Sequence, residues 1–397
     1  MALSLWNFLC DKLFRWLEIF TKTPYWRSKL AFFTIIYILF TSFPEYQLLV
    51  KMDTGGKRLA ARLELIDWIG THPFEAIPDS VFIGKVLNEG DKSHFKKRII
   101  RPLIPASLHA LGLQAKHYVI VQFFIGVLFV VFLIHLLSKY LSPVASVIAT
   151  FMFANLFVTK WTFYDFFYHD PLGYLILLML AVYRSPLLIA LGIALGGFVD
   201  ERTVIGSTAI VLWWYWHESN YQKVPLRQLF SIPKYRATWA AMSGIIFFFL
   251  LRELIQLLLS FKADISMITF QYNSFMMGLA VTYECAWFVL IGVVLAMIAT
   301  KDWLFLVLYL LSALSVVIVG SIVLDHSRSY AYGFVLVLFA LVYLYKSESK
   351  LSFQHGLTFC AIGCFLFPTY NQISYFLFWM PPIYPKIKVL LTFYGLI

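Results

Sequence analysis

Residues 161–202 read WTFYDFFYHDPLGYLILLMLAVYRSPLLIALGIALGGFVDER, and this stretch sets the class of protein. Its apolar runs are almost continuous, yet they enclose Asp165, His169, Asp170 and the charged triplet at 200–202. An ionisable group inside a bilayer costs about 2.5–3.5 kcal/mol by insertion scales, and it persists where it faces a cavity, a partner or a site. The stretch therefore predicts a polar cavity at one face of a polytopic membrane protein.

The whole chain has the composition of a membrane protein. Of its 397 residues, 61% are hydrophobic and 13% are charged, and the mean hydropathy is +0.78. Soluble domains carry about 25% charged residues, so a soluble globular protein is excluded. The apolar runs are about 20 residues long and lack the alternation of a barrel strand, which predicts spanning helices. The four cysteines indicate neither a disulfide framework nor a zinc site.

The apolar runs predict an all-α fold with about eleven transmembrane helices, within a range of about ten to thirteen. The runs are 30–48, 118–138, 141–159, 164–183, 186–199, 203–216, 239–261, 277–299, 303–323, 329–345 and 353–370. Residues 1–29 form a predicted interfacial amphipathic helix, and residues 30–397 a single transmembrane domain. A long outer loop over 50–116 is expected to contain amphipathic helices. The proline-rich tail predicts a re-entrant segment or a twelfth span.

Lysine and arginine gather in short loops that all fall on the N-terminal side of the membrane. Such residues mark the cytoplasmic side, so the N-terminus is expected in the cytoplasm. The same placement explains the net charge of +11 and argues against a nucleic-acid partner. Counting spans forward from there places nine ionisable residues at the outer face, namely Asp53, Asp165, Asp170, Asp200, Glu201, Arg202, Asp264, Asp325 and Arg328.

Four motifs follow one another along the chain. They are HFKKRIIRPLIP at 94–105, FYDFFYHDPLGYLILLMLA at 163–181, GGFVDERTVIG at 196–206 and LDHSRSYAYGF at 324–334. In this order they resemble the multispanning GT-C-type glycosyltransferases. The resemblance implies a polyprenyl-phosphate sugar donor, transfer at the outer face, and a glycan, lipid or protein acceptor. Membrane lipid is the remaining expected partner, and a bacterial inner membrane the expected location.

The resemblance also implies roles for carboxylates. A carboxylate acts as general base on the acceptor hydroxyl, and Asp53 occupies the position just after the first span where members of the group carry it. Asp165 and Asp170, at the opening of a later span, are further candidate catalytic acids. His169 is a candidate supporting group, with a packing histidine as the alternative.

Four arginines are candidate donor-phosphate ligands, because a guanidinium group binds phosphate oxygens with paired hydrogen bonds. Arg98 and Arg101 end the basic cluster of the outer loop, where general attraction to anionic lipid is the alternative. Arg202 and Arg328 are the other two.

Three acids are candidate supporting groups for these arginines. Asp200 or Glu201 is expected to hold Arg202, and Asp325 lies one helical turn from Arg328. Purely structural ion pairs are the alternative.

The chain departs from the GT-C pattern in its metal-binding element. The nearest match to an Asp-x-Asp motif is Glu89-Gly90-Asp91, which reads as a solvated turn. No metal ligand is therefore assigned, and a divalent metal stays a possibility.

Two other functions fit the same charges: a polysaccharide polymerase or ligase, and a transporter or lipid flippase, which broken helices near mid-membrane would favour. Arg252 and Glu253 lie within a predicted span and are expected to face the bundle interior.

Overall fold

The computed structural model describes most of the chain. The described residues are 2–42, 57–75, 77–78, 99, 101–164, 169–223, 225, 227–228, 231–258, 275–323, 325–367, 369–373, 376–380 and 391–392. Within these ranges the protein is almost entirely helical, which confirms the all-α prediction. The sheet described there is a two-stranded antiparallel hairpin, β1 (Tyr370–Ile373) and β2 (Phe376–Trp379), with Tyr370 opposite Trp379.

The helices follow the apolar runs closely. The part of the chain before residue 118 holds α1 (Ala2–Lys22), α2 (Trp26–Thr41), α4 (Lys57–Thr71), α6 (Leu103–Ala110) and the short η3 (Ala115–His117). The first part of the bundle holds α7 (Tyr118–Tyr140), α8 (Pro143–Asn155), α9 (Phe157–Tyr164), α10 (Asp170–Val182), α11 (Pro186–Val199), α12 (Arg202–Glu218) and α13 (Arg236–Leu258). The second part holds α14 (Phe275–Tyr283), η5 (Glu284–Ala286), α15 (Trp287–Ala299), α16 (Trp303–Ile322), α17 (His326–Tyr330), η6 (Ala331–Gly333), α18 (Phe334–Ser347) and α19 (Lys350–Leu366).

Local sequence signals explain several helix ends. The Ser142 hydroxyl accepts a hydrogen bond from the Ala145 amide at the start of α8, and Pro143 occupies the first helical position. The last helix ends at Leu366, short of the predicted limit at 370. Pro368 follows, and a proline cannot continue a helix because it lacks the amide hydrogen.

Fewer helices pass a strict test for membrane spans than the sequence predicts. Among the described residues, five helical segments are long and apolar enough to cross a bilayer, or six if the bent pair of α8 and α9 counts as one span. The shorter apolar helices α10 and α11 fall outside this set. A membrane protein with transmembrane helices is therefore supported, while the number eleven stays a prediction.

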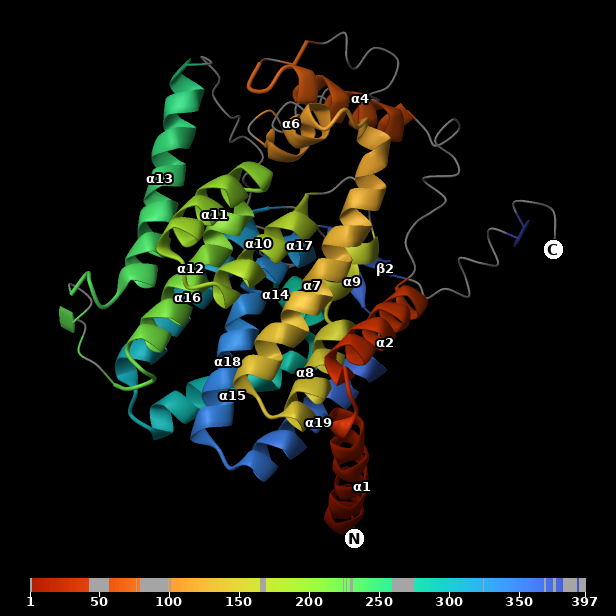
Figure 1. Ribbon diagram of the computed structural model, residues 1–397, viewed down its shortest axis with the longest axis vertical. Coiled ribbons are helices and arrows are strands. Elements are labelled where there is room, and N and C mark those ends of the chain that lie inside the picture. The colour runs from red at the N-terminus through yellow and green to blue at the C-terminus, as the bar shows by residue number, and fades with distance from the viewer. Residues whose placement is uncertain are drawn as a thin grey trace.

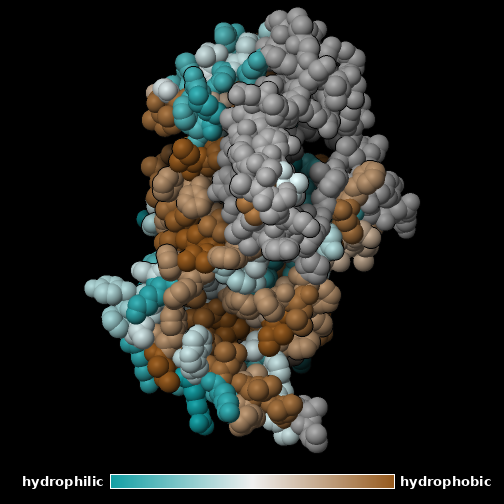
Figure 2. Space-filling view, turned by 90° about the vertical axis from the view of Figure 1, so that its right-hand side faces the viewer, coloured by the Kyte–Doolittle hydropathy of each residue, from teal (hydrophilic) through white to brown (hydrophobic). Residues whose placement is uncertain are grey.

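An apolar surface surrounds the middle of the protein. Leu250 of α13 and Leu311 of α16 are 66% and 57% exposed, as lipid-facing side chains would be. Figure 2 shows hydrophobic residues over much of the middle of one face, with hydrophilic residues above and below. Residues 334–343 of α18 are all buried, because this helix lies inside the bundle. A helix that is apolar on every side is expected in such a position.

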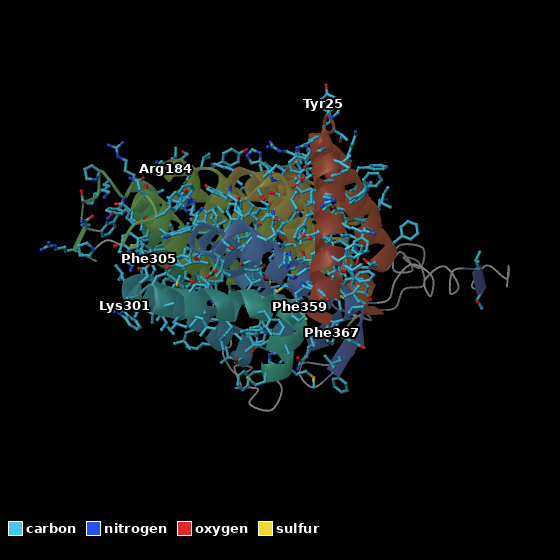
Figure 3. The ribbon with its side chains drawn as sticks, turned by 90° about the horizontal axis from the view of Figure 1, so that it is seen from below. Tyr25, Arg184, Lys301, Phe305, Phe359 and Phe367 are labelled. Carbon is cyan, nitrogen blue, oxygen red and sulfur yellow. The ribbon has the colours of Figure 1, made fainter. Side chains whose placement is uncertain are left out.

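The basic loops gather at one end of the bundle. Arg184 pairs with Glu218 at 3.4 Å, and the Lys346 ammonium lies 3.7 Å from the centroid of the Tyr221 ring. These contacts join the C-terminal ends of α10, α12 and α18. Figure 3 views the protein from this end, with Arg184 and Lys301 near the edge. The N-terminus lies at this end too, and α4 and α6 lie at the opposite end (Figure 1).

Glycines allow α10, α12 and η6 to pack closely. A Cβ atom on Gly206 of α12 would lie 2.8 Å from the Tyr332 carbonyl oxygen, and one on Gly173 of α10 would lie 2.7 Å from the Thr203 hydroxyl oxygen. Side chains at these positions would separate the helices. The close approach brings the N-terminal ends of α10 and α12 next to α17.

Candidate functional site

Six charged side chains form one continuous chain of ion pairs at the end of the bundle opposite the basic loops. Their order alternates in sign, from Arg101 through Asp200, Arg202, Asp170 and Arg328 to Asp325. The successive nitrogen-to-oxygen distances are 2.8, 2.7, 2.7, 2.8 and 2.6 Å. We call this set the charge chain. Three arginines and three aspartates make it neutral.

Each member is positioned by the end of an element. Asp200 lies in the turn between α11 and α12, where its Oδ1 accepts hydrogen bonds from the Arg202 amide at 3.0 Å and from Arg202 Nε at 2.7 Å. Asp170 is the first residue of α10, with Pro171 next to it. Arg101 lies just before α6. Because these ends meet, residues that are 99 to 158 positions apart in sequence become neighbours.

Burial differs between the middle and the two ends of the charge chain. The side chains of Asp170 and Asp200 are 0% and 1% exposed, whereas Arg101 is 27% exposed at one end and Asp325 is 24% exposed at the other. Charges removed from water are tolerated only where opposite charges and hydrogen bonds offset the loss of hydration. The middle of the chain is therefore a rigid ionic core, and its two ends are the parts that a ligand can reach.

Neutral side chains complete the ionic core. Asp170 Oδ1 accepts a hydrogen bond from the Tyr332 hydroxyl at 3.1 Å, and Arg202 Nη1 donates to the Ser329 hydroxyl at 3.1 Å. The Arg328 guanidinium lies 5.8 Å from the centroid of the Trp161 ring. A network in which the members are bonded on several sides holds its geometry more firmly than separate pairs do.

Asp200 stays ionised in this setting. Burial by itself would raise the pKa of Asp200, but the nearby charges of Arg101 and Arg202, with hydrogen bonds from Arg202, hold that pKa well below its usual range. A permanently negative Asp200 fixes both guanidinium groups beside it.

A second ion pair branches from the same turn. Glu201 lies 3.6 Å from Arg252 of α13, with side-chain exposures of 30% and 22%. The Arg252 Nε atom is buried and has no hydrogen-bond partner among the described residues. The expectation that Arg252 and Glu253 both face the bundle interior is right for Arg252 and wrong for Glu253, which is exposed. Adjacent positions on a helix point about 100° apart, so both could not face one neighbour.

The structure brings together six of the residues that were predicted from the sequence as site residues, and these six make up the charge chain. The Asp325–Arg328 pair has the one-turn spacing that the sequence suggests. Glu201 shares the turn with Asp200 but bonds outward to Arg252. His169 is buried beside Asp170, with its ring edge against Tyr118 at a centroid distance of 5.5 Å. Asp53, Asp165 and Arg98, as well as the turn at 89–91, lie outside the described residues.

Sequence reasoning missed some of the partners. Tyr332 lies four residues after Arg328, so the helical repeat could have placed it nearby. No pattern in the sequence predicted Ser329 and Trp161 as partners of the arginines. No group of three metal-ligating side chains capable of holding a metal ion occurs in the described part of the chain.

Known proteins give no further guide to function. No protein-family model matches this chain, no curated protein is similar to it, and no solved structure matches its fold. The resemblance to GT-C glycosyltransferases therefore rests on the four sequence motifs, and function has to be argued from the site.

Proposed function

We propose that the protein is a membrane glycosyltransferase that moves a sugar from a polyprenyl-phosphate donor to an acceptor at the non-cytoplasmic face. One observation carries this proposal: all four motifs contribute to the charge chain. Arg101 comes from the first motif, Asp170 from the second, Asp200 and Arg202 from the third, and Asp325 and Arg328 from the fourth. A shared site accounts for this convergence, whereas purely structural pairing of buried charges is the alternative that the binding experiment below tests.

Arg101 is the proposed first contact for the donor phosphate. Its side chain is the most exposed of the three arginines in the charge chain, although its Nε atom, which has no hydrogen-bond partner among the described residues, is itself buried. Arg202 and Arg328 lie deeper, where aspartates both neutralise them and hold them in place, so their proposed part is to provide guanidinium dipoles of fixed position near the departing phosphate. Charges fixed in advance stabilise a transition state without reorganisation.

The carboxylates divide into two proposed roles. Asp170 has no exposed surface, and each of its oxygens accepts a hydrogen bond from a guanidinium group. We therefore assign Asp170, like Asp200, to positioning the arginines. The base that removes the acceptor proton is proposed to be Asp53, with Asp165 as the second candidate. The acceptor is a glycan, a lipid or a protein, and the proposed location is a bacterial inner membrane.

Binding of farnesyl phosphate to the protein in nanodiscs tests the phosphate site. We expect Arg101→Ala to weaken the affinity roughly 10- to 100-fold, because a hydrogen bond to a charged group contributes about 1.5–3 kcal/mol. Quenching of tryptophan fluorescence measures the affinity, since the chain has 12 tryptophans and Trp161 lies beside Arg328.

Arg184→Ala is the matched control, because Arg184 pairs with an acid at the opposite end of the bundle. Equal affinities for Arg101→Ala and wild type would remove Arg101 from the phosphate site. Activity is then sought with a panel of polyprenyl-phosphate sugars, and with pyrophosphate-linked oligosaccharides, which would reveal a polymerase or ligase instead.

A transporter is the second candidate function, and one observation favours it. Helices α8 and α9 meet at an angle of 58°, and η5 interrupts the segment from α14 to α15. Broken helices of this kind form ion and substrate sites in transporters. Uptake of a labelled sugar phosphate into proteoliposomes, with no transfer product, would favour this alternative.

A further inference from the structure

A second polar cluster lies apart from the charge chain, at the helix breaks. Lys160 of α9 donates a hydrogen bond from Nζ to the Thr369 hydroxyl oxygen at 2.9 Å. The same hydroxyl oxygen lies 3.2 Å from Glu284 Oε1 and 3.1 Å from the Asn155 carbonyl oxygen. Thr369 therefore connects a buried ammonium group to a carboxylate.

Three interruptions of the backbone meet at this cluster. Helix α8 ends at Asn155 and α9 continues after a bend of 58°. Glu284 opens η5 in the left-handed region, with a φ of 47° that is unusual for a residue other than glycine. Thr369 follows the end of α19. Figure 1 shows α9 and α14 near mid-height in the bundle. Irregular backbone at membrane depth persists only where protein surrounds it or where it lines a cavity.

The charged groups of the cluster are bonded incompletely. Glu284 Oε2 is buried and has no hydrogen-bond partner among the described residues. Lys160 is 5% exposed, and within the described part of the chain its hydrogen bond goes to Thr369. An ammonium group has three donor hydrogens, and an ionised carboxylate accepts through both oxygens. The ionic form is thus held less firmly here than in the charge chain.

Among the described residues, one cation, Lys160, faces Glu284 from the elements around it. Lys160 comes from α9, Cys364 from α19, and Cys285 is the next residue along the chain. Tyr37 of α2 is linked through its hydroxyl, which donates to Asn155 Oδ1 at 2.5 Å. Burial favours the neutral carboxyl group, and the single ammonium group favours the carboxylate. These effects oppose each other, so a small displacement of Thr369, which bonds to both groups, can decide between them.

We propose that Glu284 is a proton-binding site, which takes a proton from water on one of its carboxylate oxygens and later releases it. Binding changes the pair from a carboxylate beside an ammonium group to a carboxyl group beside an ammonium group, and the net charge rises by one. The proton returns to water when Lys160 approaches the carboxyl group. The site involves no residue of the charge chain, so it stands whether or not the protein transfers sugar.

The infrared band of protonated carboxyl groups tests this site in nanodiscs without any ligand. We expect a band that grows as the pH falls between about 9 and 5, a range open to buried glutamates. Glu284→Gln should remove the titrating band. Lys160→Met should keep the band present up to a higher pH than in wild type, because the ammonium group that favours the carboxylate is then gone.

Glu218→Gln is the matched control, since Glu218 is also buried but accepts hydrogen bonds from the amides of Ala237 and Thr238. The infrared carboxyl band of this variant should depend on pH in the same way as that of the wild type. If Glu284→Gln fails to fold, the Lys160→Met spectrum decides. A wild-type spectrum without a titrating band, a band that persists in Glu284→Gln, or a Lys160→Met band that titrates like wild type would each overturn the proposal.

Discussion

Arg328 forms ion pairs with two carboxylates, and replacing it would deprive each of them of a cationic partner. It bonds to Asp170 at 2.8 Å and to Asp325 at 2.6 Å. Of the two acids, only Asp325 has exposed surface, so the charge on Asp170 would be the costly one. The stability of the folded protein therefore depends more on the pairing of Arg328 with Asp170 than on either charge by itself.

A double-mutant cycle measures that pairing. We expect Arg328→Ala to lower the free energy of unfolding by about 3–5 kcal/mol, as breaking a buried pair does. The double variant with Asp170→Asn should lose less free energy of unfolding than the two single variants lose together. The difference, which is the coupling energy of the pair, should be about 0.5–3 kcal/mol. Denaturant unfolding in detergent checks this, and strictly additive losses would show that the two residues act separately.

The carboxyl group of Asp302 should make the stability of the folded protein depend on pH. It lies in the turn between α15 and α16, where burial raises its pKa, while a hydrogen bond from Tyr343 and the charge of Lys223 oppose that shift. The folded protein therefore binds this proton more tightly than the unfolded chain does. The contribution of Asp302 to stability is greatest below its unfolded pKa of about 3.9, and it is lost as pH rises through the folded pKa.

Asp302→Asn removes the titrating group and keeps an oxygen that can accept from Tyr343. The variant should melt at a higher temperature than wild type at neutral pH, and this gain should disappear near pH 4, around the usual aspartate pKa. A gain of the same size at both pH values would contradict the assignment.

The charged residues of the cluster and the partners close to them in sequence could be predicted, but the partners distant in sequence could not. An aspartate or arginine beside a run of leucine and phenylalanine is conspicuous, so Asp170, Arg202 and Arg328 were all predicted as site residues. The Asp325–Arg328 pair followed from helical spacing. The contact between Arg101 and Asp200 depends on how segments 99 residues apart pack, and no local pattern encodes that. Lys160 was missed because it resembles the usual lysine at the end of a span.

At the scale of elements, the contact between α12 and η6 holds the site together. Gly206 lets α12 approach the Tyr332 carbonyl oxygen, and Tyr332 in turn donates a hydrogen bond to Asp170. A backbone oxygen cannot rotate away as a side chain can. The glycine is therefore needed at this position for its lack of a Cβ atom.

Gly206→Ala should destabilise the protein by about 1–3 kcal/mol, the usual cost of overpacking, and it should also weaken farnesyl phosphate binding. Gly356→Ala on α19 is the matched control, because a Cβ atom there would meet nothing within 4 Å. That change should be neutral or stabilising by about 0.5–1 kcal/mol. Thermal unfolding of the two variants compares them directly, and equal melting temperatures would contradict the role of Gly206.

Helices could be predicted from apolar runs, whereas their interruptions could not. The predicted run 277–299 contains the break at Glu284, and the predicted run 141–159 stops within α9. Leucine, valine and phenylalanine support a straight helix and a bent one equally, since hydropathy reports burial and not backbone direction. The direction is decided by distant contacts such as that between Lys160 and Thr369.

At the scale of the whole molecule, charged groups are sorted between the two ends. The sequence predicted that Asp170, Asp200, Arg202, Asp325 and Arg328 share one side, and the structure places them in one cluster opposite the basic loops. The grouping agrees with the prediction that these residues share one side, although the number of spans on which that prediction was based stays a prediction. Which end faces the cytoplasm stays a prediction, because the positions of the helices do not depend on it.

The charge chain also constrains how the protein is made. Proteins are synthesised from the N-terminus, so Asp170 leaves the ribosome 158 residues before Arg328. During that interval the second guanidinium partner of Asp170 does not yet exist. Arg202 is the partner that accompanies it first. A nascent chain that stops before Arg328 would therefore hold Asp170 with one of its two guanidinium partners, and the synthesis of α17 supplies the second.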